Sequence, residues 1–232
     1  MPQEIFAIVT ARNEGERIGA TLGGLALAFP GAPVWVADDG STDDTAAIAT
    51  TAGARVVRSG RPLGKGGAAT AAARDALSHA RPTAGCEDGS SIFVFCDGDL
   101  GESARSLQEL AAAIGGGGAD MAVAIFARRV GGGFGLAVGL ARRSIRRRCG
   151  LQMRAPISGQ RALSQAALRD VLPFAPGFGM ETGMTIDAVR AGRRVVEIEL
   201  DLSHRPTGRT LAGFAHRAHQ LLDILRAQAA RA

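Results

Sequence analysis

The chain has 232 residues, of which 46% are hydrophobic and 21% charged, a globular balance that excludes wholesale disorder. Aromatic residues make up only 4%, which argues against a protein that binds single-stranded nucleic acid by stacking. The net charge of +5 is compatible with phosphorylated small molecules, an anionic membrane surface or nucleic acid. Because the sequence contains no nucleic-acid-reading motif, we expect no nucleic-acid partner.

The cysteines and the apolar segments indicate the cellular compartment in which the protein is expected. Cys86, Cys96 and Cys149 lack the spacing of a zinc site, and their odd number favours a reducing environment. The acidic residue before the first apolar run does not suit a signal peptide. No run of about 20 apolar residues occurs, which predicts no transmembrane segment. We therefore expect a cytoplasmic protein.

The first half of the chain alternates short β-rich runs with helical patterns. The predicted strands are 5–10, 34–37, 55–58, 92–96 and 121–127. The predicted helices are 14–28, a segment that starts near 43, 64–80 and 103–114. This alternation predicts an α/β fold, a mostly parallel sheet with helices on both faces.

The second half is less regular. Its predicted elements are a glycine-rich and then basic helical segment over 131–154, a loop over 156–161 before a short helix, a helix over 181–191, a strand over 195–202 and an amphipathic helix over 211–231. We find neither an internal repeat nor a linker. Residues 1–232 are therefore predicted to form one domain, with halves 1–127 and 128–232.

The acidic and glycine-rich clusters follow the first, second and fourth predicted strands. In open parallel sheets, ligands bind beyond the carboxyl ends of the strands. The clusters therefore indicate one composite site at that edge of the sheet.

Asp97-Gly98-Asp99 directly follows the apolar run IFVFC. Two carboxylates can supply hard oxygen ligands to a divalent cation, and Gly98 between them lets a pyrophosphate approach the backbone. The alternative is a plain turn or helix start, because Asp and Gly are favoured there in any case.

Asp38 and Asp39 follow the second strand in the run DDGSTD. An Asp here can accept hydrogen bonds from a uracil imide or a ribose hydroxyl. The alternative is that Asp39 and Ser41 form an Asx turn while Asp43 caps the next helix.

Lys65 is the only lysine and lies in the turn Gly64-Lys65-Gly66-Gly67, which opens a predicted helix. The turn is not a Walker loop, because Gly67 stands where Ser or Thr is required. A lysine on a glycine turn at a helix N-terminus suits an anionic ligand. The alternative is a solvated loop lysine.

Two further candidates lie in the second half. His204 follows the strand 195–202, and neutral imidazole is a competent third ligand beside carboxylates, although a lone histidine is more often structural. Glu181 starts a helix, where a carboxylate is favoured electrostatically even without a role, and its glycine neighbours leave room for a ligand. The arginines within 142–148 suit a solvated helix face, an acidic acceptor or a membrane surface.

The order of these motifs resembles that of the family 2-type glycosyltransferases of the GT-A fold. The matching segments are IVTARNEGERI, VADDGSTDDT, GKGGAATAA and FCDGDL, the last as a DxD motif. Through PISGQRAL, LPFAPGFGMETGMTID and DLSHRPTGR, the second half resembles glucosyl-3-phosphoglycerate synthases and, more loosely, dolichyl-phosphate mannose synthases. The resemblance implies a Rossmann-like nucleotide-sugar half followed by an acceptor half.

The resemblance also implies roles for single residues. Asp38 or Asp39 would read the uracil, and Lys65 would neutralise donor phosphate. The residues implied to line the nucleoside are Thr10, Ala11, Arg12 and Glu14. Asp97 would touch the ribose or the metal, and Asp99 would ligate Mg²⁺ or Mn²⁺ with His204. Glu181 would act as base in an inverting reaction or orient the acceptor in a retaining one.

The resulting prediction is a metal-dependent transferase that moves a hexose from a nucleotide sugar, with UDP-glucose as the expected donor. The expected acceptor is a small phosphorylated or carboxylated molecule such as 3-phosphoglycerate, and the alternative is a polyprenyl phosphate at the cytoplasmic membrane face. A nucleotidyltransferase is disfavoured because TARNEGER lacks the glycine-rich loop of that class. The resemblance leaves a homodimer and peripheral membrane contact open.

Overall fold

The computed structural model describes residues 3–80, 90–127 and 135–202. They form a seven-stranded sheet with the order β3-β2-β1-β4-β6-β5-β7. The strands are β1 Ile5–Ala11, β2 Val34–Asp38, β3 Arg55–Arg58, β4 Ile92–Asp97, β5 Met121–Phe126, β6 Arg161–Ser164 and β7 Val195–Leu200. The helices, with 3₁₀ segments written η, are α1 Ile18–Ala28, α2 Thr45–Thr51, α3 Lys65–His79, η1 Gly101–Leu107, α4 Gln108–Gly115, α5 Gly135–Cys149, α6 Gln165–Val171, η2 Gly177–Gly179 and α7 Met180–Arg190.

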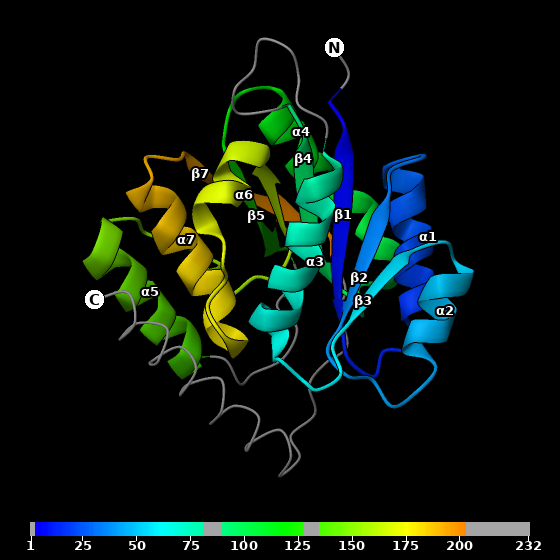
Figure 1. Ribbon diagram of the computed structural model, residues 1–232. Helices are drawn as coiled ribbons and strands as arrows, with labels where there is room; N and C mark the ends of the chain where they lie inside the picture. The colour runs from blue at the N-terminus through cyan, green and yellow to red at the C-terminus, as the bar shows by residue number, and fades with distance from the viewer. Residues whose placement is uncertain (1–2, 81–89, 128–134, 203–232) are drawn as a thin grey trace.

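The sheet lies between two layers of helices (Figure 1). Successive side chains of a strand point to opposite faces, so Phe6 and Ile8 of β1 pack with α3, α6 and α7, whereas Ala7 and Val9 pack with α1, η1 and α4. Because both faces are covered, the central strands are apolar throughout, as the run IFVFC in β4 shows. The predicted α/β fold with helices on both faces is confirmed.

Strand β6 was not predicted, because the sequence indicated a loop and then a short helix there. Its four residues, RALS, include no β-branched or aromatic side chain. The strand forms because it pairs antiparallel with β4 on one side and β5 on the other. It is the one strand of the described sheet that runs against the rest, and it places Arg161 next to the site.

Other boundaries differ by a few residues. The helix predicted over 14–28 begins at Ile18, since residues 12–17 form a loop, and the helix predicted over 103–114 divides into η1 and α4. The helix predicted over 211–231 lies outside the described residues. Within the part of the chain that the structure describes, no helix is both long enough and apolar enough to cross a membrane.

The chain first adds strands on one side of β1 and then on the other: β2 and β3 extend the sheet on one side, and β4 pairs with the opposite side of β1. All three of β1, β2 and β4 are parallel, so their carboxyl ends meet at one edge. The register pairs Thr10 with Asp97 and Ala11 with Asp38 at that edge. Such a switch point is where open α/β sheets bind ligands.

The first turn of α3 packs closely on the segment that precedes η2 and α7. A Cβ atom added to Gly66 would lie 1.9 Å from the carbonyl oxygen of Ala175. A larger residue at position 66 would therefore push apart the two segments that carry Lys65 and Glu181.

We expect Gly66→Ala to lower the free energy of unfolding by about 3 kcal/mol, because a backbone oxygen cannot yield as a flexible side chain does. Gly23→Ala is the matched control, since Gly23 is also helical but exposed, with no atom within 4 Å of an added Cβ. It should stabilise the protein by about 0.5–1 kcal/mol. Urea unfolding of both variants measures the difference, and equal midpoints would contradict the predicted clash.

Candidate active site

One ammonium group joins two carboxylates from distant parts of the chain. Lys65 Nζ lies 2.6 Å from Asp97 Oδ1 and 2.7 Å from Glu181 Oε1. Lys65 is the first residue of α3, Asp97 ends β4, and Glu181 is in the first turn of α7. The three side chains form a charge cluster, named the lysine cluster below, at the carboxyl edge of the sheet.

Two polar neighbours complete the contacts of Asp97. Thr10 donates its hydroxyl proton to Asp97 Oδ1 at 3.0 Å, and Gln160 donates an amide proton to Asp97 Oδ2 at 2.9 Å. Burial alone would raise the pKa of Asp97, but the charge of Lys65 and these hydrogen bonds outweigh it and lower the pKa. Burial likewise opposes the charge on Lys65, and the two carboxylates outweigh it and raise its pKa. Asp97 and Lys65 are therefore both charged near neutral pH.

The loop before β6 passes directly over the lysine cluster. A Cβ atom on Gly159 would lie 2.7 Å from Asp97 Oδ2 and 2.8 Å from Lys65 Nζ, so only glycine fits there without displacing a charged group. Gln160 follows it and is almost fully buried. Neither residue was assigned a role from the sequence. The sequence offered only the segment PISGQR as a signal. Its glycine and glutamine reach the lysine cluster because β6, which directly follows them, inserts beside β4.

Arg161 holds this loop in place. Its guanidinium donates to the carbonyl oxygens of Ser158 and Pro156, at 2.8 and 3.2 Å, and to the hydroxyl of Thr185 at 2.9 Å. The side chain is 0% exposed, and this burial lowers the pKa of Arg161 to about 10 against the opposing charge of Glu181. Arg161 therefore ties the loop to α7, the helix that carries Glu181.

The turn after β4 is fixed from α1. The hydroxyl of Thr21 donates to the carbonyl oxygen of Gly98 and accepts from the backbone amide of Gly101, at 2.8 and 2.9 Å. A Cβ on Gly98 would lie 3.3 Å from that of Ala11, so the turn packs tightly on the β1 end. Asp99, between these anchors, is partly exposed.

The donor set of this turn suits a divalent cation. Asp97 and Asp99 offer hard carboxylate oxygens, and a cation bound there would compete with the ammonium group of Lys65 for Asp97 Oδ1. Among the described residues, no three Asp, Glu, His or Cys side chains come together as a metal-binding group. His204, the predicted third ligand, lies outside them.

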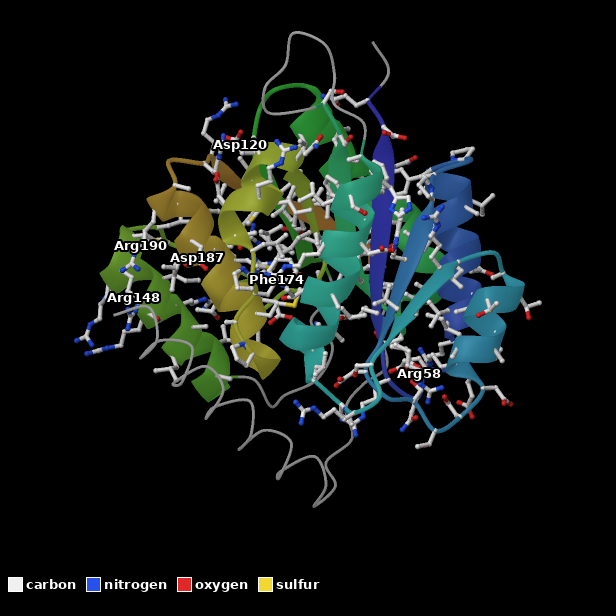
Figure 2. The ribbon with its side chains drawn as sticks, in the orientation of Figure 1. Arg58, Asp120, Arg148, Phe174, Asp187 and Arg190 are labelled. Atoms are coloured by element: carbon white, nitrogen blue, oxygen red, sulfur yellow. The ribbon has the colours of Figure 1, made fainter. Side chains whose placement is uncertain are left out.

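Asp38 and Asp39 shape the loops beside the β1 end. Asp38 is fully buried, accepts from the backbone amide of Ser41 at 2.9 Å and lies 3.2 Å from Arg58 Nε. Asp39 accepts from the amides of Leu63 and Gly64, at 2.7 and 2.9 Å. The labelled side chain of Arg58 lies at this edge (Figure 2). That either carboxylate reads a uracil stays a prediction.

Asn13, the only asparagine of the chain, joins the first two loops. It has a positive φ of 56°, a conformation that asparagine tolerates better than most residues. Its amide donates to the hydroxyl of Ser41, and its side-chain oxygen accepts from the amide of Thr42, at 2.9 and 2.8 Å. In the sequence, the one sign that Asn13 has a particular role was that the chain contains no other asparagine.

A hollow of about 480 Å³ opens beside these loops, away from the lysine cluster. It is lined by Asn13, Glu14, Gly15, Glu16, Arg17, Asp43, Asp44 and Ile48. Asp43 accepts hydrogen bonds from Thr45 and from the backbone amide of Gly15, which lower the pKa of Asp43. The carboxylate thus holds the loop together, and Glu14 is the predicted nucleoside residue that lines the hollow.

Ten of the twelve predicted site residues fall into three groups at this edge. Thr10, Lys65, Asp97 and Glu181 meet in the lysine cluster. Ala11, Arg12, Asp38, Asp39 and Gly98 lie around it at the ends of β1, β2 and β4, with Arg12 Nη1 3.8 Å from Asp39 Oδ2. Asp99 lies two residues beyond Asp97.

Comparison with known proteins shows the family of this chain. Residues 6–172 match glycosyl transferase family 2, and the chain belongs to that family. It is a glycosyltransferase that uses a nucleotide sugar. It is 30% identical to the undecaprenyl-phosphate mannosyltransferase of Micrococcus luteus over 220 residues, which cover 88% of this chain and 85% of that protein.

Among solved structures, it is similar to glucosyl-3-phosphoglycerate synthase of Mycobacterium tuberculosis. The complex of that enzyme with Mn²⁺, UDP and glucosyl-3-phosphoglycerate superposes with a TM-score of 0.71 at 28% identity, covering 97% of this chain and 80% of that one. Its complex with Mg²⁺ and UDP gives a TM-score of 0.72 at 28% identity, covering 97% and 79%.

We expect Lys65→Met to lower the free energy of unfolding at pH 7 by about 3 kcal/mol, because it leaves the buried carboxylate of Glu181 and the half-buried carboxylate of Asp97 without their cation. The folded state lowers the pKa of Asp97, so its stabilising contribution is present above about pH 4 and is lost as the pH falls further. The folded state raises the pKa of Lys65, so its contribution is present below about pH 10 and is lost above. The deficit of the variant should therefore persist from pH 7 to about pH 4 and shrink as the pH falls below about 4.

Arg74→Met is the matched control for this experiment, since Arg74 is an exposed cation on the same helix. Its effect should stay within about 0.5 kcal/mol. Urea denaturation of both variants at pH 7 and at about pH 2.5, below the ordinary pKa of an aspartate, provides the measurement. A deficit for Lys65→Met that does not change with pH would refute the charge compensation.

Proposed function

We propose that this protein transfers a hexose from UDP-glucose to a small phosphorylated or carboxylated acceptor such as 3-phosphoglycerate. The lysine cluster at the switch point of the sheet carries the proposal, because it combines a phosphate-neutralising cation with carboxylates on both sides. The solved relative from Mycobacterium tuberculosis binds UDP-glucose and phosphoglyceric acid together with Mn²⁺, at 27% identity to this chain.

The donor would bind along the ends of β1, β2 and β4. The residues proposed to contact it are Thr10, Ala11, Arg12, Glu14, Asp38, Asp39, Lys65, Asp97 and Gly98. Lys65 is ion-paired with the carboxylates of Asp97 and Glu181. A bound diphosphate would therefore compete with these two carboxylates for the same ammonium group. Donor binding would therefore exchange one anionic partner of Lys65 for another, at little cost in desolvation.

Asp97 and Asp99 would hold Mg²⁺ or Mn²⁺, with His204 as the proposed third ligand. When bound, such a cation neutralises the charge that develops on the departing nucleotide. The chain's own contribution is to position the carboxylates: Thr10 and Gln160 fix Asp97 from either side, and Thr21 fixes the turn that carries Asp99.

Glu181 is the proposed acceptor-side residue. It lies at the start of α7, nearly fully buried, with Oε1 against Lys65. In an inverting reaction, its carboxylate would remove the proton from the attacking hydroxyl. In a retaining reaction, Glu181 would orient the acceptor, and the leaving phosphate would take that proton.

A second candidate is transfer to a polyprenyl phosphate. The Micrococcus luteus relative acts on undecaprenyl phosphate by its name and matches 88% of this chain, which is the observation that favours this candidate. A phosphate oxygen that is already ionised needs no general base, so Glu181 would be dispensable for proton transfer in that case.

A coupled assay of nucleotide release separates these candidates. The protein is incubated with Mg²⁺ or Mn²⁺, a panel of sugar nucleotides, and either 3-phosphoglycerate or a short polyprenyl phosphate. Release that requires UDP-glucose, metal and 3-phosphoglycerate together supports the first proposal. Release only with the polyprenyl phosphate supports the second, and silence with every pair rejects both.

Asp99→Ala should reduce metal-dependent turnover by roughly 100-fold or more, because it removes a proposed ligand while the fold remains intact. Glu109→Ala, at an exposed acidic position of α4, is the control and should turn over as the unmodified protein does. Initial rates across a metal titration give the readout. Near-normal turnover by Asp99→Ala would remove Asp99 from the metal site.

Gln160→Glu should shift the acid limb of the rate–pH profile to higher pH. The new carboxylate would face Asp97 Oδ2, and a like charge at hydrogen-bond distance raises the pKa of its neighbour. Asp97 would then lose its charge at a higher pH than in the unmodified protein. Gln108→Glu makes the same charge change at an exposed position and should leave the profile in place. Superimposable profiles for both variants would show that Gln160 does not tune Asp97.

A further inference from the structure

Helix α5 concentrates positive charge on one element. It carries five arginines between positions 142 and 148 and no acidic residue. Ala141 and Ile145 are fully buried, and α5 packs against α7. Figure 2 shows Arg148, near the end of α5, on the same side of the molecule as Asp187 and Arg190 of α7.

A hollow of about 330 Å³ lies between α5 and the segment that follows it. Three exposed arginines, Gly139, Gln152 and Met153 line it, the arginines being Arg142, Arg143 and Arg146. Positions three and four apart share one face of a helix, so these three guanidinium groups gather at one place. The hollow is open at Gly139, since no atom lies within 4 Å of a Cβ added there.

The nearby carboxylates are engaged with the backbone of the same segment. Glu197 accepts from the amides of Arg154 and Ala155, at 2.8 and 2.6 Å, and Glu199 pairs with the Arg154 side chain at 3.0 Å. Arg142 donates to the carbonyl oxygen of Arg154 at 2.5 Å. Within residues 3–80, 90–127 and 135–202, the arginines of the hollow have no carboxylate partner.

Three guanidinium groups without a carboxylate partner among the described residues, placed around one concave surface, favour a compact, multiply charged anion. Arginine forks match the oxygens of a phosphate in pairs, and the amide of Gln152 supplies a further polar contact. If these arginines only met solvent, their surface would not need to be concave. The shape and the charge together therefore suit a phosphate group.

The hollow is joined to the lysine cluster by a short stretch of chain. Five residues lie between Met153, which lines the hollow, and Gly159, which covers Asp97 and Lys65. An extended chain over these six steps spans at most roughly 20 Å. The part of the hollow at Met153 is thus at most about that far from the loop that covers the cluster.

We infer that the hollow lined by Arg142, Arg143 and Arg146 binds the phosphate of the sugar acceptor, an inference that rests on the proposed transferase function. The phosphate belongs either to a soluble phosphate ester or to the headgroup of a lipid phosphate. Both sources share the same charge and oxygen geometry, and the anchored phosphate holds the acceptor on the α5 side of the site.

Calorimetric titration of the full chain with inorganic phosphate tests the site without turnover. Arg142→Gln combined with Arg146→Gln should raise the Kd for phosphate at least about tenfold. Arg147→Gln combined with Arg74→Gln removes the same charge from exposed arginines that do not line the hollow, and should raise it less than about twofold. Equal weakening by both pairs, or no phosphate binding by the unmodified protein, would overturn the inference.

The KM for each acceptor then identifies the source of the phosphate. In the Arg142/Arg146 pair, a selective rise for 3-phosphoglycerate assigns a soluble ester, and a selective rise for the short polyprenyl phosphate assigns a lipid headgroup. An unchanged KM for both overturns the assignment to the acceptor. Intact phosphate binding beside a silent transferase assay would reject the proposed function alone, so the two failures are distinguishable.

Discussion

The charge compensation at Lys65 is the constraint on which the rest of the site depends. One ammonium group lies within 2.7 Å of carboxylates from β4 and α7, which come from different halves of the chain. Removing any of the three charges leaves an uncompensated ion in a largely buried place. The cluster therefore fixes α7 against α3, and the charge of Lys65 also lowers the pKa of Asp97, which ends β4.

Supporting contacts explain how the fold holds this cluster still. Thr10 reaches Asp97 because β1 and β4 are paired in parallel register, and Gln160 reaches it because β6 inserts antiparallel beside β4. Arg161, fully buried, bonds to two loop carbonyls and to α7, so the loop above the cluster and the helix beside it move together. Burying the Arg161 cation among mainly neutral partners costs desolvation energy. Its hydrogen bonds in turn fix the positions of the loop and of α7.

The two kinds of relative differ in the acceptor named for each, undecaprenyl phosphate in one and phosphoglycerate in the other. The family match over residues 6–172 takes in β1 to β6, the strands that deliver the proposed donor contacts. The charged hollow on α5 is the proposed site of the acceptor's phosphate, and its chemistry suits a phosphoglycerate and a lipid phosphate alike. The arginines of the hollow therefore do not by themselves distinguish the two acceptors, whereas the KM for each acceptor does.

The sequence by itself determined the parallel strands and the presence of chemistry at their carboxyl ends, because apolar runs, glycine turns and acidic clusters are local patterns. It marked Lys65, Asp97 and Glu181 as separate candidates, each with an ordinary alternative. Only the tertiary structure decided that both carboxylates contact Lys65, since Asp97 lies 32 positions after Lys65 and Glu181 lies 84 positions after Asp97. It also decided the roles of Gln160, Gly159 and Arg161, because β6 forms through pairing with distant strands, and a four-residue run without β-branched side chains carries no local signal for it.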